Sequence, residues 1–276
     1  MAKHRNPLPT PEEKAAKRQA AKLEKTKRIA LIFIAASVII AAFFTYSFFF
    51  GNPILKSSAQ SNIKTHIELN FPSLDLELSA VKYDRETGAF YAVASSPTSV
   101  DTHFSVYAKG AEVWDYYADS VKGLFNTIDR VELAFSETAK SVLVKNGVID
   151  EKAEVSVAVF DFVNARESGT FTVDMPIKAD IECDFTLYVT ADKTASVEAL
   201  AQTLTEIKSE LDSAELPNIT HLTLVLKQGE KTASAQNVPL ENIDEGLVNT
   251  LTHALENPPT PFGSGENERP LRVSVN

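Results

Sequence analysis

The longest unbroken pattern in the chain is an apolar run, IALIFIAASVIIAAFFTYSFFF, at residues 29–50. No charged side chain interrupts it, and a helix of this length, rising about 1.5 Å per residue, can cross about 30 Å of hydrocarbon. We therefore expect a single transmembrane helix at 29–50, in contact with the lipid bilayer. A signal peptide cleaved after Ala59 is the competing interpretation. The apolar core of a signal peptide is usually about 7–15 residues long, which favours an uncleaved anchor.

Helical spacing resumes directly after this run. Asn52 can cap a helix and Pro53 fits its first position, so a helix should lead off the membrane and stop before Pro72. Its apolar stripe recurs every four residues, at Leu55, Ala59, Ile63 and Ile67.

Further along, the apolar positions alternate, and two stretches resemble each other. RETGAF at 85–90 and RESGTF at 166–171 each place a glycine where a hairpin turn needs a positive φ. Sliding one stretch over the other also aligns alternating positions that are typical of β-strands. These are 74–78 with 155–159 before the turns, and FSVYA (104–108) with FTLYV (185–189) after them.

An apolar stripe at helical spacing follows the strands in both stretches. The stripes are Trp114, Tyr117, Val121, Leu124 and Ile128 in the first, and Val197, Leu200, Leu204, Ile207 and Leu211 in the second. The first stripe runs on to Val142, either as one long helix or as two with a break near Gly123–Asn126. A strand at 219–227 and a last helix at 241–255 complete the pattern.

These elements predict an α+β fold, in which an N-terminal transmembrane helix precedes two repeated modules. Each module is expected to be an antiparallel three-stranded meander packed with helices. The sequence leaves open whether the two modules share one sheet. The predicted parts are a basic cytoplasmic segment at 1–28, the transmembrane helix at 29–50, exported modules at 51–148 and 149–258, and a flexible tail with a short strand at its end, 259–276.

Charge divides the chain at the apolar run. Residues 1–28 contain nine basic and three acidic side chains, whereas the whole chain has a net charge of −10. Because basic flanks stay on the cytoplasmic side, we expect a cytoplasmic N-terminus, a single pass and an extracellular C-terminal region. The acidic exported part does not favour nucleic acid. The basic segment could contact anionic lipid headgroups or act as a topology determinant alone; the side chains nearest the membrane are Lys22, Lys25, Lys27 and Arg28.

The stretch VDTHF at 100–104 offers the most plausible chemistry. Asp101 and His103 would share one face of a strand, where a carboxylate can orient an imidazole as a general base. Together with Asp115 they define an alternative function, a metal-dependent or hydrolytic envelope enzyme. The corresponding IECDF of the second module keeps an acid but has no histidine, so we favour an outward-facing polar row.

Other candidate residues are weaker. Asp180, Glu182 and Asp184 could offer oxygens to calcium, but calcium takes about six to eight ligands, so a solvated strand face is preferred. Cys183 is the single cysteine, which excludes an intramolecular disulfide, and we expect it to be buried without redox chemistry. The chain has no G-x-S-x-G, P-loop, G-x-G-x-x-G or H-E-x-x-H motif. We therefore predict no enzyme, no catalytic, cofactor-binding or metal-ligating residue, and no cofactor.

The run FYAVASSPTSVDTHFSVYAKGAEVWDYYADSVKGLFNTIDR at 90–130 resembles the YfjL-like membrane-anchored proteins of Bacillus-type, Gram-positive bacteria. FTLYVTADKTASVEALAQTLTEIKSEL is similar in layout to their C-terminal part, so the resemblance extends over about 55–255. It implies an envelope protein with two α+β modules and transfers no functional residue. A helix followed by a β-meander is also similar, more loosely, to PepSY and cystatin-like modules.

The sequence thus predicts a single-pass envelope protein whose exported modules act as a non-catalytic binding or interaction domain with a protein partner at the cell envelope. The enzyme built on Asp101, His103 and Asp115 is the first alternative. An extracellular ligand sensor that signals through a partner is the second.

Overall fold

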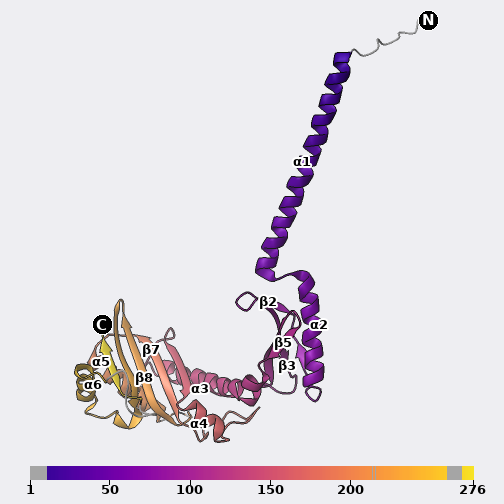
Figure 1. Ribbon diagram of the computed structural model, residues 1–276. Helices are drawn as coiled ribbons and strands as arrows, with labels where there is room; N and C mark the ends of the chain where they lie inside the picture. The colour runs from indigo at the N-terminus through magenta and orange to yellow at the C-terminus, as the bar shows by residue number, and fades with distance from the viewer. Residues whose placement is uncertain (1–10, 213, 215, 260–268) are drawn as a thin grey trace. The chain divides into compact units, whose positions relative to one another are not determined.

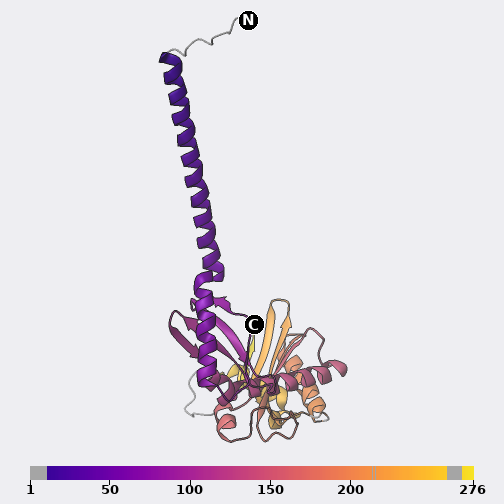
Figure 2. The same cartoon turned by 90° about the vertical axis from the view of Figure 1, so that its right-hand side faces the viewer.

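The computed structural model of the chain describes residues 11–212, 214, 216–259 and 269–276 (Figure 1). Its first element, α1, is a continuous helix over Pro11–Phe50 that contains the predicted transmembrane run. Within the described residues it supplies the one stretch long and apolar enough to cross a membrane, and none of its 18 most apolar consecutive residues is buried by protein. Figure 2 shows α1 as one unbroken helix. The N-terminal apolar helix is therefore confirmed, and part of its basic flank belongs to the same helix.

Helix α2 (Pro53–Asn70) begins where the sequence predicts. The side chain of Asn52 accepts a hydrogen bond of 2.9 Å from the backbone N–H of Ile54, which satisfies one of the free donors of the first turn. The helix ends at Phe71, whose N–H donates to the carbonyl of Ile67. Its predicted stripe faces the protein at three of four positions, Ala59, Ile63 and Ile67.

The connection between α1 and α2 requires glycine. Gly51 has a φ of +74°, which a residue with a Cβ seldom adopts. A Cβ at this position would lie 2.5 Å from Cζ of Phe90 and 2.7 Å from Cδ2 of Tyr83. The aromatic rings of the first sheet therefore pack directly on the backbone at the end of the apolar helix.

The first sheet has five strands in the order β1-β3-β4-β5, with β2 paired to β3. β2 and β3 are antiparallel and joined by the predicted RETG turn, in which Gly88 has a φ of +68°. Alternate residues of β3 and β4 are buried, as the alternation predicts. The strands are β1 (Glu77–Leu78), β2 (Lys82–Asp84), β3 (Ala89–Ser95), β4 (His103–Lys109) and β5 (Glu112–Asp115).

The helical stripe after this sheet is interrupted. Trp114, predicted to start it, lies in β5, and a short π-helix (Ala118–Lys122) follows. Leu124 then adopts a φ of +62°, and α3 runs over Phe125–Lys145. Of the two alternatives, the break near Gly123–Asn126 is correct. The prediction for Trp114 is wrong because its ring stacks on Tyr107 of the neighbouring strand instead of packing under a helix.

The second sheet is mixed, with the order β10-β9-β8-β7-β6. β7 and β8 are parallel and joined by a helix, whereas the other neighbours are antiparallel. Helices α3, α5 and α6 share one continuous hydrophobic core with this sheet. The elements after α3 are β6 (Glu154–Val159), α4 (Phe162–Glu167), β7 (Phe185–Asp192), α5 (Val197–Leu211), β8 (Ile219–Gln228), β9 (Lys231–Pro239), a 3₁₀ turn (Leu240–Asn242), α6 (Leu247–Glu256) and β10 (Arg272–Val275).

The antiparallel meander predicted for the second module is wrong. RESG does not form a hairpin, because Asp161 caps α4 by accepting a hydrogen bond from the N–H of Asn164, and Arg166 and Glu167 continue that helix. The α+β character is therefore confirmed, whereas the two stretches do not share the order of their elements. β9 has no predicted counterpart, and β10 forms the expected short strand of the tail, in which residues 260–268 lie outside the described residues.

The chain forms two compact units. They do not coincide with the predicted bounds 51–148 and 149–258, because α3 packs on β6. The first unit comprises Met1–Ser73, Leu78–Val93 and Val106–Trp114, and the second comprises Leu74–Glu77, Ala94–Ser105 and Asp115–Asn276.

Helix α3 protects the open edge of the second sheet at β6. The N–H of Val157 donates to Oγ of Ser136 at 2.8 Å, and the N–H of Val159 donates to Oε1 of Glu132 at 2.7 Å. An unpaired strand edge would otherwise invite pairing with another chain. Burial raises the pKa of Glu132, although the hydrogen bond from Val159 opposes this shift.

Replacing Glu132 should separate its role as a hydrogen-bond acceptor from the effect of burying its charge. Glu132→Gln keeps an acceptor for Val159 without a buried charge, so its free energy of unfolding at pH 7 should exceed that of the wild type. Because the folded-state pKa of Glu132 is raised, the extra stability of the Gln variant should grow as the pH rises from about 4.5 toward neutrality. It should vanish below about pH 4.5, where the acid is protonated in both the folded and the unfolded state. Glu132→Ala should lower the free energy of unfolding by about 1–3 kcal/mol. Denaturant titrations of the full chain in detergent test both; a Gln variant less stable than wild type at pH 7 contradicts the argument.

Candidate functional site

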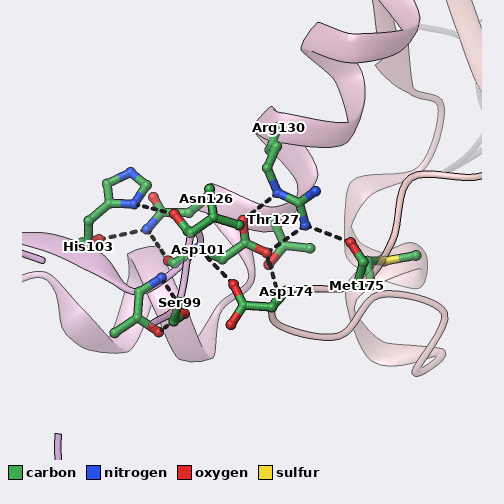
Figure 3. A network of polar contacts seen from close by, with 10 residues as sticks. Ser99, Asp101, His103, Asn126, Thr127, Arg130, Asp174 and Met175 are labelled. Atoms are coloured by element: carbon green, nitrogen blue, oxygen red, sulfur yellow. Dashed lines mark hydrogen bonds and ion pairs between the residues drawn. The ribbon is translucent and has the colours of Figure 1, made fainter. Parts of the chain in front are cut away.

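Asp101, the carboxylate of the alternative enzyme hypothesis, lies in the loop before β4, and its side chain is only 2 % exposed. Its Oδ1 accepts a hydrogen bond of 2.6 Å from Nε of Arg130, and its Oδ2 accepts one of 2.9 Å from Nη2 (Figure 3). Oδ2 also accepts from Oγ1 of Thr127 at 2.9 Å and from the N–H of Asp174 at 2.7 Å. The carboxylate is therefore fully engaged by protein donors.

The network around Asp101 joins two loops to the start of α3. Asp101 and Asp174 exchange hydrogen bonds, since the N–H of Asp101 donates to Oδ1 of Asp174 at 3.0 Å. Arg130 also donates to the carbonyl of Met175 at 2.8 Å. On the other side, Nδ2 of Asn126 donates to the carbonyls of Asp101 and His103, at 2.8 and 2.6 Å. All these residues belong to the second unit.

The electrostatics of the network favour a permanent ion pair. Burial raises the pKa of the Asp101 carboxyl, but hydrogen bonds from Arg130, from the N–H of Asp174 and from Thr127 outweigh it, so the pKa lies below its ordinary value. The same contact raises the pKa of Arg130. Asp101 therefore stays ionised near neutral pH and cannot serve as an acid.

His103 and Asp115 do not join this carboxylate. The imidazole of His103 is exposed, points away from the Asp101 carboxylate in Figure 3, and has Nδ1 3.2 Å from the carbonyl of Val100. The carboxylate of Asp115 accepts a hydrogen bond of 3.0 Å from the N–H of Tyr117. The outward-facing row is wrong for Asp101, because β4 begins only at His103 and strand alternation does not reach Asp101.

The acidic stretch before β7 also departs from the predicted strand. Residues 180–184 are irregular, with a bend at 182–183, and Asp184 accepts a hydrogen bond of 2.7 Å from Asn218. Cys183 is half-buried rather than enclosed, and burial together with nearby carboxylates raises the pKa of its thiol to about 11. The described residues contain no group of three or more His, Cys, Asp or Glu side chains arranged to hold a metal ion.

A hollow that the sequence did not predict lies in the first unit. It encloses about 740 Å³ and is lined by Phe48, Tyr83, Asp84, Arg85, Glu86, Tyr91 and Tyr107. Tyr91 and Tyr107 stack with centroids 5.3 Å apart, and Tyr107 stacks on Trp114 at 5.4 Å. Aromatic residues at the outward positions of neighbouring strands are the sequence signal that could have indicated this surface.

Breaking the ion pair should destabilise the second unit. Asp101→Asn leaves Arg130 without its carboxylate, so we expect a loss of about 3 kcal/mol in the free energy of unfolding, the lower end for a buried pair because Arg130 is partly exposed. Adding Arg130→Met should restore part of this loss, since the unpaired charge is removed.

The matched control for this experiment is the more exposed pair Lys193–Glu206, whose Nζ and Oε2 atoms are 3.3 Å apart and whose side chains are 31 % and 38 % exposed. Glu206→Gln should cost less than about 1 kcal/mol. Denaturation of the full chain in detergent, followed by circular dichroism, compares the variants. Equal effects of Asp101→Asn and Glu206→Gln would show that the Asp101 pair contributes no more than an exposed one.

Residues 25–115 match the family model described as YfjL-like, N-terminal domain. The match covers most of α1, all of α2 and the first sheet, and it confirms the family resemblance for this region. No curated protein and no solved structure matches the chain.

Proposed function

We propose that the chain is a single-pass membrane-anchored envelope protein whose exported α+β region is a non-catalytic binding or interaction domain. The observation that carries the proposal is the junction after α1. Only Gly51 and Asn52 separate the apolar helix from α2, and the rings of Phe90 and Tyr83 pack against Gly51. Such a junction holds the first unit at the end of the apolar helix rather than on a flexible tether.

The same junction supports an uncleaved anchor. Ala59, after which a signal peptidase could cut, lies inside α2 and is 4 % exposed. Cleavage there would remove the capped first turn of α2 together with α1. The basic residues before position 29 favour a cytoplasmic N-terminus and an extracellular C-terminal region.

The engagement of Asp101 supports a non-catalytic role. A general base needs a carboxylate within hydrogen-bond reach of the imidazole that it orients. Asp101 is directed at Arg130 and Thr127 instead, so the hydrolytic alternative with His103 and Asp115 would require this network to break.

Single-cysteine labelling tests the orientation and the retention of the anchor. In a Cys183→Ser background, a membrane-impermeant maleimide should label Lys64→Cys in intact cells and Lys25→Cys only after permeabilisation. The labelled chain should keep its full mass of 30.2 kDa. The reverse labelling pattern contradicts the orientation, and a product shortened at Ala59 contradicts the uncleaved anchor.

Crosslinking in cells tests the interaction role. The tagged full-length chain should capture the same envelope protein with and without the change His103→Ala, because the exposed imidazole carries no catalytic role. Mass spectrometry identifies the captured protein. Loss of the cellular phenotype in the His103→Ala variant, at an unchanged melting temperature, would instead favour the enzyme.

A further inference from the structure

The hollow of the first unit lies where α1 leaves its apolar run. Phe48, in the last turn of α1, is 64 % exposed and forms part of its wall. When the apolar run occupies about 30 Å of hydrocarbon, its last turn lies at the level of the lipid headgroups. The hollow therefore opens where a headgroup would be.

Arg85 provides a cation with free donors at this level. Its guanidinium carbon lies 5.2 Å from the ring centre of Phe48 and 5.1 Å from that of Phe49. Within the described part of the chain, no carbonyl or carboxylate oxygen accepts a hydrogen bond from this guanidinium. Its planar set of N–H groups matches a phosphate, to which arginine can donate two parallel bonds.

Two carboxylates on the same turn exclude a purely anionic ligand. Asp84 accepts hydrogen bonds from the N–H of Glu86 at 2.9 Å and from Oγ1 of Thr87 at 2.8 Å. The hydrogen bond from Thr87 has the largest effect, and both bonds lower the pKa of Asp84, so its carboxylate is ionised at neutral pH. Glu86 is exposed, and its carboxylate has no hydrogen-bond or ion-pair partner among the described residues. A ligand that brings only negative charge would be repelled by this pair.

The aromatic side of the hollow complements a positive group. Tyr107 stacks on Trp114 and on Tyr91, so Tyr91 at the end of this stack offers the ring face that can attract an ammonium ion. The volume of about 740 Å³ falls within the range of about 300–1,000 Å³ for small-molecule sites. The lining thus offers an arginine to a phosphate, and a carboxylate with an aromatic face to an ammonium group.

We propose that the hollow binds the phosphoethanolamine headgroup of a membrane phospholipid. Arg85 donates hydrogen bonds to the phosphate, and the carboxylate of Glu86 and the ring of Tyr91 receive the ammonium group. The exposed ring of Phe48 covers the glycerol end of the lipid. This inference rests on the membrane anchoring in the proposed function and names a ligand for the binding domain.

Trp114 provides the readout, since it is the single tryptophan of the chain and stacks on Tyr107 with an interplanar angle of 10°. The full chain in maltoside micelles is titrated with dihexanoyl phosphatidylethanolamine, dihexanoyl phosphatidylglycerol and soluble phosphoethanolamine. We expect a saturable change in Trp114 fluorescence with phosphatidylethanolamine. Arg85→Gln should weaken this binding by about tenfold or more, because charge-assisted hydrogen bonds are lost.

The RESG stretch at 166–169, which resembles the RETG turn, supplies matched controls. Arg166→Gln and Glu167→Gln change the same residue types on α4 and should leave the titration unchanged. Glu86→Gln should reduce the preference for phosphatidylethanolamine over phosphatidylglycerol. Melting temperatures of all variants establish that each one folds.

Several outcomes overturn the inference. Equal binding of phosphatidylglycerol and phosphatidylethanolamine contradicts ammonium recognition. If soluble phosphoethanolamine binds as tightly as phosphatidylethanolamine, a lipid is not the source of the bound headgroup. No saturable change, or equal effects of Arg85→Gln and Arg166→Gln, contradicts the site itself. Because the titration in micelles does not depend on topology, a reversed labelling pattern with intact binding would overturn the proposed function alone.

Discussion

The second unit depends on the buried ion pair between Asp101 and Arg130. Arg130 reaches one carboxylate with two nitrogens and a backbone carbonyl with the same Nη2, a geometry that a lysine ammonium could not reproduce. The net gain of such a pair is small because desolvation offsets the attraction, yet removing one partner costs about 3–5 kcal/mol. We infer that the pair acts mainly as a constraint, which permits one arrangement of the loops at Asp101 and Asp174.

Helix α3 extends this constraint into the sheet. Arg130, in its second turn, holds the loops, while Glu132 and Ser136 accept the outward N–H groups of β6. Other positions of the same helix, including Val131 and Phe135, belong to the hydrophobic core. One helix therefore fixes the loops, covers the sheet edge and contributes to the core, which explains why the compact unit begins well before β6.

Local patterns predicted those parts of the fold that local forces decide. The cap at Asn52, the stripe of α5 and the alternation of β3, β4 and β8 are all as expected, because each depends on neighbours within a few residues. The hairpin predicted at RESG is wrong because Asp161, just upstream, caps a helix whose end contains this stretch. The parallel pairing of β7 and β8 depends on long-range packing, which periodicity does not report.

The candidate site was less predictable than the fold. The stretch VDTHF contains Asp101, but the partners of this carboxylate, Arg130 and Asp174, are distant in sequence, and no spacing rule links them. The hollow combines residues from α1, from the RETG turn and from two strands. The turn itself was predicted from Gly88, whereas the position of Arg85 over Phe48 follows only from the folded chain.

The junction at Gly51 decides how this hollow can act. A flexible linker would let the first unit drift from the membrane, as glycine- and serine-rich tethers do. Here the chain passes from α1 into a capped helix through two residues, and the rings of Phe90 and Tyr83 pack against Gly51. Tyr83 also lines the hollow. A group bound there therefore lies beside a ring that also packs on Gly51, the first residue of the link between α1 and α2.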